Sequence, residues 1–563
     1  NIEVYVAGEG AVAEYLGEYI DADSRRLYPL IGLVIVAILS IAYRTPRGVG
    51  VPLAIVIGAV LISLGSMAGS GTPMYLITNA LPVILIAIGV ADAIHIMGAY
   101  YEEIALRPRS LKRQPVVRAM VELWRAVLFT SVTDAAGFLA LAAASSSMPP
   151  MRAFGIYACV GVVGSCVFSL IVLPSILVLL PVRPSKSFKA HSTQRGEEHF
   201  DRFGLVMGAV GRFVVRFPYA VLSVFIVVAG LGVYGALQLR VDYARIDYFH
   251  EDEPIRKADA LINDRFNGST FIDIVIDAKQ PDGLLTADVM RKIEALQQYA
   301  ATLPNVGGST SIADYVKQMN RALFEDDESE YRIPDDDGLI AKYFLLFAAT
   351  GDPEALSKIV DYDYRLANVR ISLKSGWYQD IKETILPLEE YVQREFGGTE
   401  VSASIAGRAN VTYHWLETLA STHVAGVVAS LLTVLVCAAI SFRSLYAGIL
   451  AVTPVSLSVL ANSAVMCASA IPLAVGTSMF AAIGIGISVN FAIHTLHRTI
   501  ELVRDYGEQI ELALTQLFPS TGRALLFNFA AVFFGFSVLM ISQLKALQDF
   551  GGLPAPLVRE SMR

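Results

Sequence analysis

Apolar residues predominate in ten stretches of the chain over about 20 positions each, the length that a helix needs to cross the hydrocarbon core of a membrane. These stretches lie near residues 27–43, 50–69, 78–101, 126–144, 154–181, 217–237, 422–442, 446–469, 473–496 and 524–541. The pattern therefore predicts an α-helical polytopic membrane protein. A long polar segment, residues 239–421, separates the sixth span from the seventh.

The polar segment has the pattern of a soluble α+β domain. Strand-like alternation and helix-like periodicity follow one another as strand 271–278, helix 285–299, strand 366–373, helix 381–396 and strand 400–406. Two strand-helix-strand units of this kind suit a ferredoxin-like, or split βαβ, domain.

The composition fits a chain that lies mostly in a membrane. Apolar residues make up 54% of it and charged residues 17%, against about 25% charged residues in an ordinary soluble protein. The net charge of −8 is unevenly distributed, because residues 238–421 hold 19 Lys or Arg against 32 Asp or Glu. No stretch has the basic surface that phosphate binding demands, which excludes nucleic acid as the main partner.

No motif for catalysis, cofactor binding or metal binding stands out. All four cysteines, Cys159, Cys166, Cys437 and Cys467, fall in apolar runs, so neither a disulfide framework nor a thiolate zinc site is indicated. The acidic loop 325–337 lacks the spacing of a calcium loop and is expected to be solvated. Without a Ser-His-Asp set, an HExxH motif or a phosphate-binding glycine loop, we expect no enzyme, no cofactor and no metal.

Lys and Arg in the short loops predict the orientation, because these residues mark the cytoplasmic side. Arg44 and Arg47 follow the first span, and further basic residues follow the third and the fifth spans, within residues 107–125 and 183–216. The loops between are nearly uncharged. The acidic insert 239–421 is therefore expected outside the cytoplasm, in a bacterial or archaeal cell in the periplasm or at the exterior.

The chain contains an internal repeat, which becomes visible when it is shifted by 399 residues. The shift matches Ala7-Gly8 to Ala406-Gly407, Arg44 to Arg443, Pro73 to Pro472 and Ala93-Ile94-His95 to Ala492-Ile493-His494. After a slippage of one residue, Gly137-Phe138 match Gly535-Phe536. We interpret the membrane part as two parallel copies of one helical unit, an arrangement that favours transport.

The repeat also predicts the domain organisation. By symmetry the first copy lacks an opening helix and most of an outer domain, of which a last strand at residues 2–7 is expected to remain, and the second copy stops short of a last helix. The expected parts are a domain remnant 1–26, a first bundle 27–182, a cytoplasmic linker 183–216, a helix 217–238, the outer domain 239–421, a second bundle 422–545 and a truncated approach to a last helix, 546–563.

Polar side chains within the spans are functional candidates, because an ionisable group at mid-bilayer costs roughly 3 kcal/mol or more. Asp92 and His95 are three residues apart and share a helix face, so they are suited to exchange protons near neutral pH. The alternative is a structural pair that only holds helices together. The other candidates are Thr130 and Asp134 in the fourth span, Ser488, Asn490 and His494 in the ninth, and Asn528 in the tenth.

Several of these runs resemble the resistance-nodulation-division (RND) superfamily. They are GVADAIH at 89–95, GISVNFAIH at 486–494, TSVTDAAGFL at 130–139 and LRVDYARIDYF at 239–249. The chain is most similar to the hydrophobe exporters, which include hopanoid transporters and the mycobacterial membrane protein large (MMPL) group, and whose membrane core is related to the sterol-sensing domain.

The resemblance implies twelve helices, of which ten are present here, two periplasmic porter-like domains and export driven by the proton gradient across the inner membrane. The implied partners are the membrane, protons, a hydrophobic substrate such as a lipid, hopanoid, sterol or drug, and a second copy of the chain or a periplasmic lipid carrier. Relatives occur as trimers or monomers.

The resemblance also implies a proton relay, from which this chain departs at two positions. The family's acid position in the third span is occupied by Ala91, with the acid shifted to Asp92, and in the ninth span it is occupied by Asn490, which cannot titrate. We therefore expect the proton carriers to be Asp92, His95 and Asp134. Asn490 and His494 are expected as their polar partners, with Thr130, Ser488 and Asn528 as supporting polar groups.

Two other functions remain open at this point. One is a sterol-sensing or lipid-binding membrane protein without turnover, in which Asp92 is structural. The other is an envelope scaffold that uses the outer domain for docking.

Overall fold

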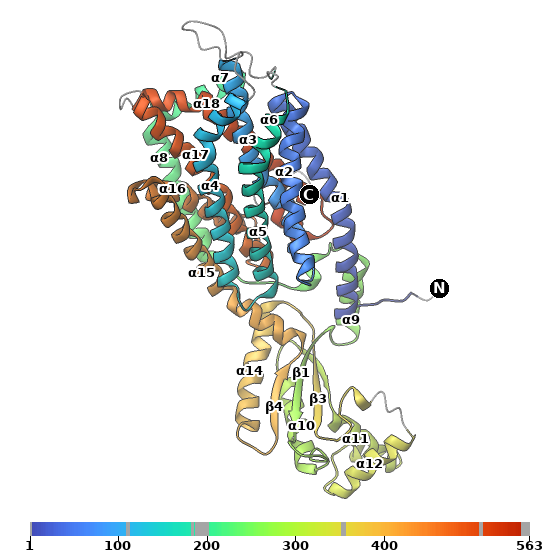
Figure 1. The fold of residues 1–563 in the computed structure, drawn as a ribbon. Coiled ribbons are helices and arrows are strands. Elements are labelled where there is room, and N and C mark those ends of the chain that lie inside the picture. Colours follow the sequence, from blue (N-terminus) through green and yellow to red (C-terminus); the bar gives the residue numbers. More distant parts are fainter. Residues whose placement is uncertain are drawn as a thin grey trace. The chain divides into compact units, whose positions relative to one another are not determined.

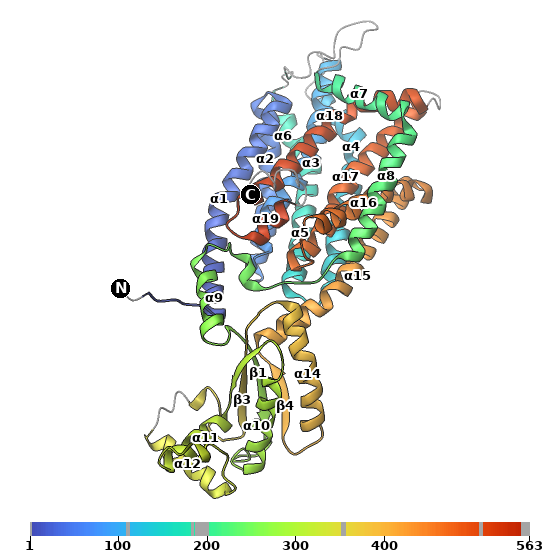
Figure 2. The same cartoon turned by 180° about the vertical axis from the view of Figure 1, so that it is seen from behind.

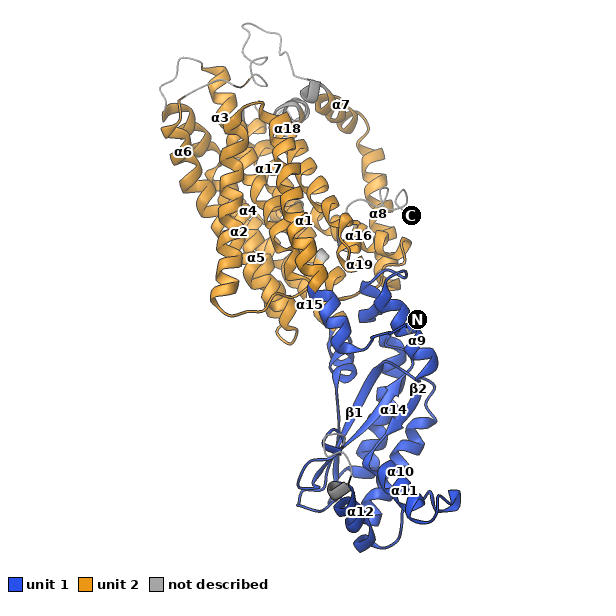
Figure 3. Ribbon diagram, turned by 90° about the vertical axis from the view of Figure 1, so that its right-hand side faces the viewer, with its two compact units in different colours: residues 1–17, 241–418 blue, residues 18–240, 419–563 orange. Residues whose placement is uncertain are grey.

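The computed structural model describes residues 3–107, 113–181, 185, 202–350, 356–505 and 510–552. The chain divides into two compact units, which are distinguished by colour in Figure 3. Unit 1 comprises residues 1–17 and 241–418, and unit 2 comprises residues 18–240 and 419–563.

Unit 2 is a bundle of long apolar helices (Figure 1). Its spans are α1 (Glu9–Tyr43), α2 (Pro46–Gly69), α3 (Leu81–Leu106), α4 (Arg113–Ala144), α5 (Pro149–Val167), α6 (Leu173–Leu179), α8 (Pro218–Gln238), α15 (Arg408–Phe442), α16 (Leu445–Ala468), α17 (Val475–Asp505) and α18 (Ile510–Ser537). A π-helical segment, Phe168–Val172, joins α5 to α6 into one span. In the described part of the chain, ten helices are long and apolar enough to cross a membrane, which confirms the predicted spans.

Three shorter helical elements complete this unit. A 3₁₀ turn at Thr78–Ala80 leads into α3, a second at Val538–Ile541 follows α18, and the short helix α19 (Lys545–Gly552) comes next. Between the two halves of the bundle, α7 (Arg202–Arg216) packs against α18.

Two of the helices extend well beyond the apolar stretches that predict them. α1 begins at Glu9 and α15 at Arg408, each directly after a glycine with positive φ, Gly8 (φ 97°) and Gly407 (φ 89°). Hydropathy marks only the part of a helix that suits hydrocarbon, whereas the backbone continues as a helix until a residue of different conformation ends it.

The offset of 399 residues recurs in the backbone. The bounds of α1 and α15 differ by this number at both ends, and so do those of α2 and α16. The turn after each first helix places an arginine at positive φ, 49° for Arg44 and 52° for Arg443. The next helix is then capped by a hydroxyl that accepts a hydrogen bond from a backbone N–H of its first turn. Thr45 accepts from Gly48 in the first half, and Ser444 accepts from Ala447 in the second.

The centre of the bundle is formed by α3, α4, α17 and α18. α3 packs against α18 and α4 against α17, so each half contacts the other through equivalent pairs of helices. In the most apolar stretch of this span, 94% of the residues are buried inside the protein. α3 is apolar on all sides, as expected for a helix that is surrounded by other helices.

Unit 1 contains a four-stranded antiparallel sheet with the order β2-β3-β1-β4. The strands are β1 (Thr270–Asp277), β2 (Val306–Thr310), β3 (Leu366–Leu373) and β4 (Ser402–Ala406). The helices are α9 (Pro254–Arg265), α10 (Ala287–Ala301), α11 (Ile312–Leu323), α12 (Asp337–Thr350) and α14 (Tyr378–Phe396). Figure 1 shows α10 and α14 running beside the strands.

The register of the sheet follows from the alternation along its central strand. Ile272, Ile274 and Ile276 of β1 are fully buried, and Ile274 pairs with Val369 of β3 and Ile405 of β4. The strands that alternation predicts at 271–278, 366–373 and 400–406 are confirmed, as are the helices at 285–299 and 381–396, with ends that differ by a few residues.

Two features differ from the sequence-based expectation. The strand expected at residues 2–7 is wrong over 3–7, which are irregular, because no described strand pairs with them. β2 was not predicted, since its sequence VGGST lacks alternating apolar residues and the strand exists through pairing with β3. Residues 182–184, 186–201 and 553–563 of the predicted linker and C-terminal segment lie outside the described residues.

Candidate functional site

Asp92 lies in the buried middle of α3 and accepts a hydrogen bond from α4. Its Oδ2 accepts from Ser131 Oγ of α4 at 3.1 Å. Its Oδ1 is buried and has no hydrogen-bond partner among the described residues. Burial disfavours the charged form of a carboxyl group, and an oxygen without a hydrogen-bond donor can bind a proton.

Asp134 is the second buried carboxyl group, on α4. Its Oδ1 also has no hydrogen-bond partner among the described residues. The neighbouring helix α17 presents Gly486 here, and a Cβ at this glycine would lie 3.4 Å from Asp134 Oδ1. The helices that carry Asp92 and Asp134, α3 and α4, pack against each other.

His95 and His494 meet face to face between α3 and α17. Their ring centroids are 3.9 Å apart and the ring planes are inclined by 11°. Both side chains are buried, with exposed fractions of 5% and 4%, and neither Nε2 atom has a hydrogen-bond partner in the described part of the protein. The structure thus joins two residues that the sequence relates only through the repeat.

The other predicted polar residues have varied surroundings. Asn490 on α17 and Asn528 on α18 are buried, each with an Oδ1 that has no partner among the described residues. Thr130 donates to backbone carbonyls of its own helix, those of Ala126 and Val127.

Ser488 lies outside this cluster. Its hydroxyl donates to Ser458 Oγ of α16 at 2.8 Å. This contact holds α16 and α17 of the same half together, whereas the carboxyl and imidazole groups lie where the two halves meet.

The two halves contribute different chemistry to this centre. Among the described residues, the buried carboxyl groups where the halves meet, Asp92 and Asp134, come from the first half, on α3 and α4. The buried middle of α17 and α18 supplies amides instead, Asn490 and Asn528, together with His494. In the described part of this centre, the carboxyl groups therefore come from the first half and the amides from the second.

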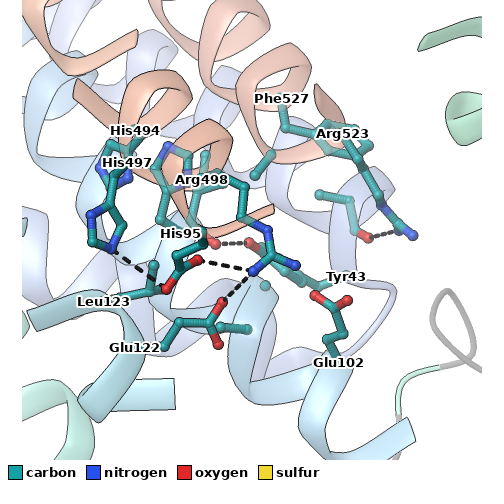
Figure 4. A pocket seen from close by; sticks show the side chains of 16 residues that line it. Tyr43, His95, Glu102, Glu122, Leu123, His494, His497, Arg498, Arg523 and Phe527 are labelled. Atoms are coloured by element: carbon teal, nitrogen blue, oxygen red, sulfur yellow. Dashed lines mark hydrogen bonds and ion pairs between the residues drawn. The ribbon is translucent and has the colours of Figure 1, made fainter. Parts of the chain in front are cut away.

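A cavity of about 90 Å³ adjoins the histidine pair (Figure 4). His95 and His494 line it together with His497 and with charged residues of α3, α4 and α17, which are Glu102, Glu122, Arg498 and Glu501. On its other side are Tyr43, whose hydroxyl donates to the Ile94 carbonyl at 2.6 Å, and Arg523, which donates to the Ala42 carbonyl at 3.1 Å.

Arg498 forms the main ion pairs in this cavity. Its Nη1 lies 3.0 Å from Glu501 of its own helix and 3.5 Å from Glu122 of α4. His497 Nε2 lies 3.8 Å from the Glu501 carboxylate. The charged residues therefore connect a helix of one half to a helix of the other.

The sequence analysis did not select these charged residues. Glu102, Glu122 and Glu501 fall beyond the ends of the apolar stretches, where charged residues are usually solvated. One available signal was the repeat, because Glu102 and Glu501 are separated by the same 399 residues as the two histidines.

In the described residues, no group of three or more His, Cys, Asp or Glu side chains is arranged to hold a metal ion. The four cysteines are unpaired. The site thus offers acid–base groups, hydrogen-bonding amides and a charged cavity.

Comparison with known proteins identifies the family. The family model described as MMPL matches residues 1–221 and 257–555. The chain belongs to the MMPL family. A protein of Methanocaldococcus jannaschii that is described as a membrane protein is 23% identical to this MMPL protein over 365 residues, which cover 62% of this chain and 87% of that protein. The predicted resemblance to the RND and MMPL group is confirmed, and this MMPL family member is a multi-pass membrane protein.

Proposed function

We propose that this MMPL protein is a transporter that exports hydrophobic or amphiphilic molecules and is driven by the proton gradient. The observation that carries the proposal is the pair of buried carboxyl groups, Asp92 and Asp134, where the two halves of the bundle meet. Each has an oxygen without a hydrogen-bond partner among the described residues. Groups that gain and lose protons at such a contact alter its electrostatic energy and can bias movement of the halves.

The paired architecture supports alternating access. Equivalent helices of the two halves have bounds 399 residues apart, and α3 packs against α18 as α4 packs against α17. Parallel repeats related by an axis along the membrane normal are typical of transporters in which the halves rock against each other. Protonation of Asp92 and Asp134 would favour one arrangement of the halves and deprotonation the other.

The outer domain is proposed to receive the substrate. Its strands and helices include the succession β1-α10-β2-β3-α14-β4 with the sheet order β2-β3-β1-β4, the connectivity of a split βαβ domain. We assign it as a porter-like domain on the periplasmic or outer side of the inner membrane. Lipids, hopanoids, sterols or drugs are suitable substrates, and the protein has no enzymatic role in this proposal.

One observation also fits a different function, that of a lipid-binding or sterol-sensing protein without turnover. The hydrogen bond from Ser131 to Asp92 is a contact that would serve a purely structural carboxyl group equally well. The two functions differ in whether loss of the Asp92 carboxyl stops transport or only weakens the bundle.

The test uses the full chain in proteoliposomes. The lipids that copurify with the gently extracted protein are identified by mass spectrometry and reconstituted with it, and their transfer to albumin outside the vesicles is measured with and without an imposed pH gradient. We expect gradient-dependent transfer that a protonophore abolishes.

Asp92→Asn and Asp134→Asn should each stop this transfer, whereas the control Ser488→Ala, which alters a hydrogen bond within one half, should retain it. If both carboxyl variants keep the thermal stability of the parent and still transfer lipid with the same dependence on the gradient, the proposal is refuted.

A further inference from the structure

The cavity beside the histidine pair combines two features that point to passage of protons. It is lined by three carboxylates, those of Glu102, Glu122 and Glu501. It is also lined by two imidazoles, His95 and His494, that are at least 95% buried and whose Nε2 atoms have no partner among the described residues.

The carboxylates lie nearer to solvent than the imidazoles. The side chains of Glu122 and Glu501 are 40% and 36% exposed, whereas the histidines are buried. On the other side of His95, one turn back along α3, is Asp92. The order from solvent inward is therefore carboxylate, imidazole and buried carboxyl group (Figure 4 shows the first two).

The cavity lies near the C-terminal ends of α3, which finishes at Leu106, and of α17, which finishes at Asp505. It also lies near the N-terminal part of α4. The segment that links α3 to α4 belongs to the basic loop 107–125, whose Lys and Arg residues predict the cytoplasmic side. The cavity therefore opens on that side in the proposed orientation.

Arg498 lines the cavity beside two of these carboxylates. It forms ion pairs with Glu122 and Glu501 and ties α17 to α4, so it joins one half of the bundle to the other. The equivalent residue of the first half is Ala99, so the arrangement has no symmetric copy.

We propose that this cavity is the cytoplasmic antechamber of the proton pathway and that the Glu122–Arg498–Glu501 clamp controls movement of protons between it and the histidine pair. The inference rests on the proposed function. A proton that binds Glu122 or Glu501 neutralises that carboxylate, which weakens its ion pair with Arg498 and loosens the clamp. An imidazole that takes a proton from Asp92 on one ring nitrogen and releases one from the other returns to its neutral form, and the released proton goes to the carboxylates of the cavity.

Other charged and titratable groups surround the clamp, but Glu122 and Glu501 are the carboxylates that pair with Arg498. Glu102 of α3 and His497 of α17 line the same cavity. His497 lies beside the Glu501 carboxylate. Tyr43 of α1 and Arg523 of α18 face it as well, but both donate to backbone carbonyls, of Ile94 and Ala42.

The first test is the accessibility of Ala99→Cys, a cavity-lining position, in a full-length background without the four native cysteines. A membrane-impermeant thiol reagent is added to right-side-out and to inside-out vesicles. We expect reaction from the cytoplasmic side only, about tenfold faster than for Ala87→Cys, a fully buried position on α3. Equal rates for the two positions, or reaction of Ala99→Cys from the outer side, would overturn the proposal.

The second test concerns the clamp. Glu122→Gln in the Ala99→Cys background should raise the labelling rate about threefold near neutral pH, the size of effect that loss of one partly exposed ion pair produces. Acidification should have the same effect on the intact clamp. The matched control is Glu103→Gln, because Glu103 pairs with Arg107 and Arg118 and does not line the cavity. A labelling rate that Glu122→Gln leaves unchanged would refute the clamp.

These measurements separate the two proposals. Labelling does not require transport, so the expected pattern combined with gradient-driven transfer that survives Asp92→Asn would refute the proposed function alone. Loss of transfer in Asp92→Asn with no labelling of Ala99→Cys would leave the function in place and refute the antechamber.

Discussion

The imidazole rings of His95 and His494 lie parallel at 3.9 Å although 399 residues separate them in the chain. Two positive charges at this separation repel each other by about 4 kcal/mol at an effective dielectric constant near 20. At most one of the two rings is therefore expected to carry a positive charge at a time.

The first prediction concerns this pair. His95→Phe should keep the stacking of two aromatic rings and hence the thermal stability of the bundle, since stacked rings attract each other without a charge. It should abolish gradient-dependent lipid transfer, because phenylalanine binds no proton. Melting of the purified protein and transfer in proteoliposomes are measured together. Retained transfer in both His95→Phe and His494→Phe would show that the pair conducts nothing.

The second prediction concerns the space beside Asp134. Gly486→Ala places a methyl group at an ordinary contact distance of 3.4 Å from the carboxyl group, so the variant should fold with a stability change of under about 1 kcal/mol. Gly486→Leu should displace Asp134 and cost roughly 1–3 kcal/mol. We expect lipid transfer to survive the alanine and to fail with the leucine. Transfer that is unaffected by leucine would mean that Asp134 tolerates displacement.

The third prediction tests the close approach of α8 to α16, which lie side by side in Figure 2. A Cβ at Gly235 would lie 2.6 Å from the backbone oxygen of Ser463, so Gly235→Ala should force the helices apart at a cost of roughly 1–3 kcal/mol. The control is Gly230→Ala on the same helix, where a Cβ would meet nothing within 4 Å. The difference in melting temperature between the two variants is the measurement, and equal values would contradict the packing.

The fourth prediction is a pH dependence in unit 1. Burial raises the pKa of Asp259, whose carboxyl group accepts from Ser269 and Asn263. A raised pKa means that the folded domain holds this proton more tightly than the unfolded chain does. Its stabilising contribution is full below about pH 4, the unfolded value, and is lost as the pH rises through the raised value.

Asp259→Asn should weaken this dependence, because an amide does not titrate. The rate of limited proteolysis within residues 239–421 of the full chain, measured between about pH 4 and pH 7, reports it. If the variant and the parent show the same change of rate with pH, the group does not contribute to stability.

The sequence predicts well those parts whose cause is local. β3 was predicted at its observed bounds, Leu366–Leu373, because alternation along one strand is enough to define it. The spans were predicted because hydrocarbon requires a minimum apolar length. β2 was missed because its position depends on the edge of β3, and the early starts of α1 and α15 were missed because their first turns are polar.

The same distinction applies to the candidate site. The shared face of Asp92 and His95 follows from their spacing, and the repeat relates His95 to His494. The clamp could not be predicted, because Glu122 and Arg498 are far apart in the chain and meet only through the packing of α4 against α17. Likewise, nothing in the sequence indicates that Ser488 bonds to Ser458.

In the proposed transport cycle, the two carboxyl groups at the contact of the halves, Asp92 of α3 and Asp134 of α4, limit the work that one cycle can perform. A proton that crosses a potential of 100 mV releases about 2.3 kcal/mol, so two protons supply about 4.6 kcal/mol. At about 1.4 kcal/mol for each factor of ten, this sustains a substrate gradient of roughly 10³-fold, and a single coupled proton sustains only about 50-fold. A protein with two further carboxyl groups in the second half could couple twice as many protons, which would square the roughly 10³-fold substrate gradient. Replacement of two amides by acids is therefore a short evolutionary route to a steeper gradient.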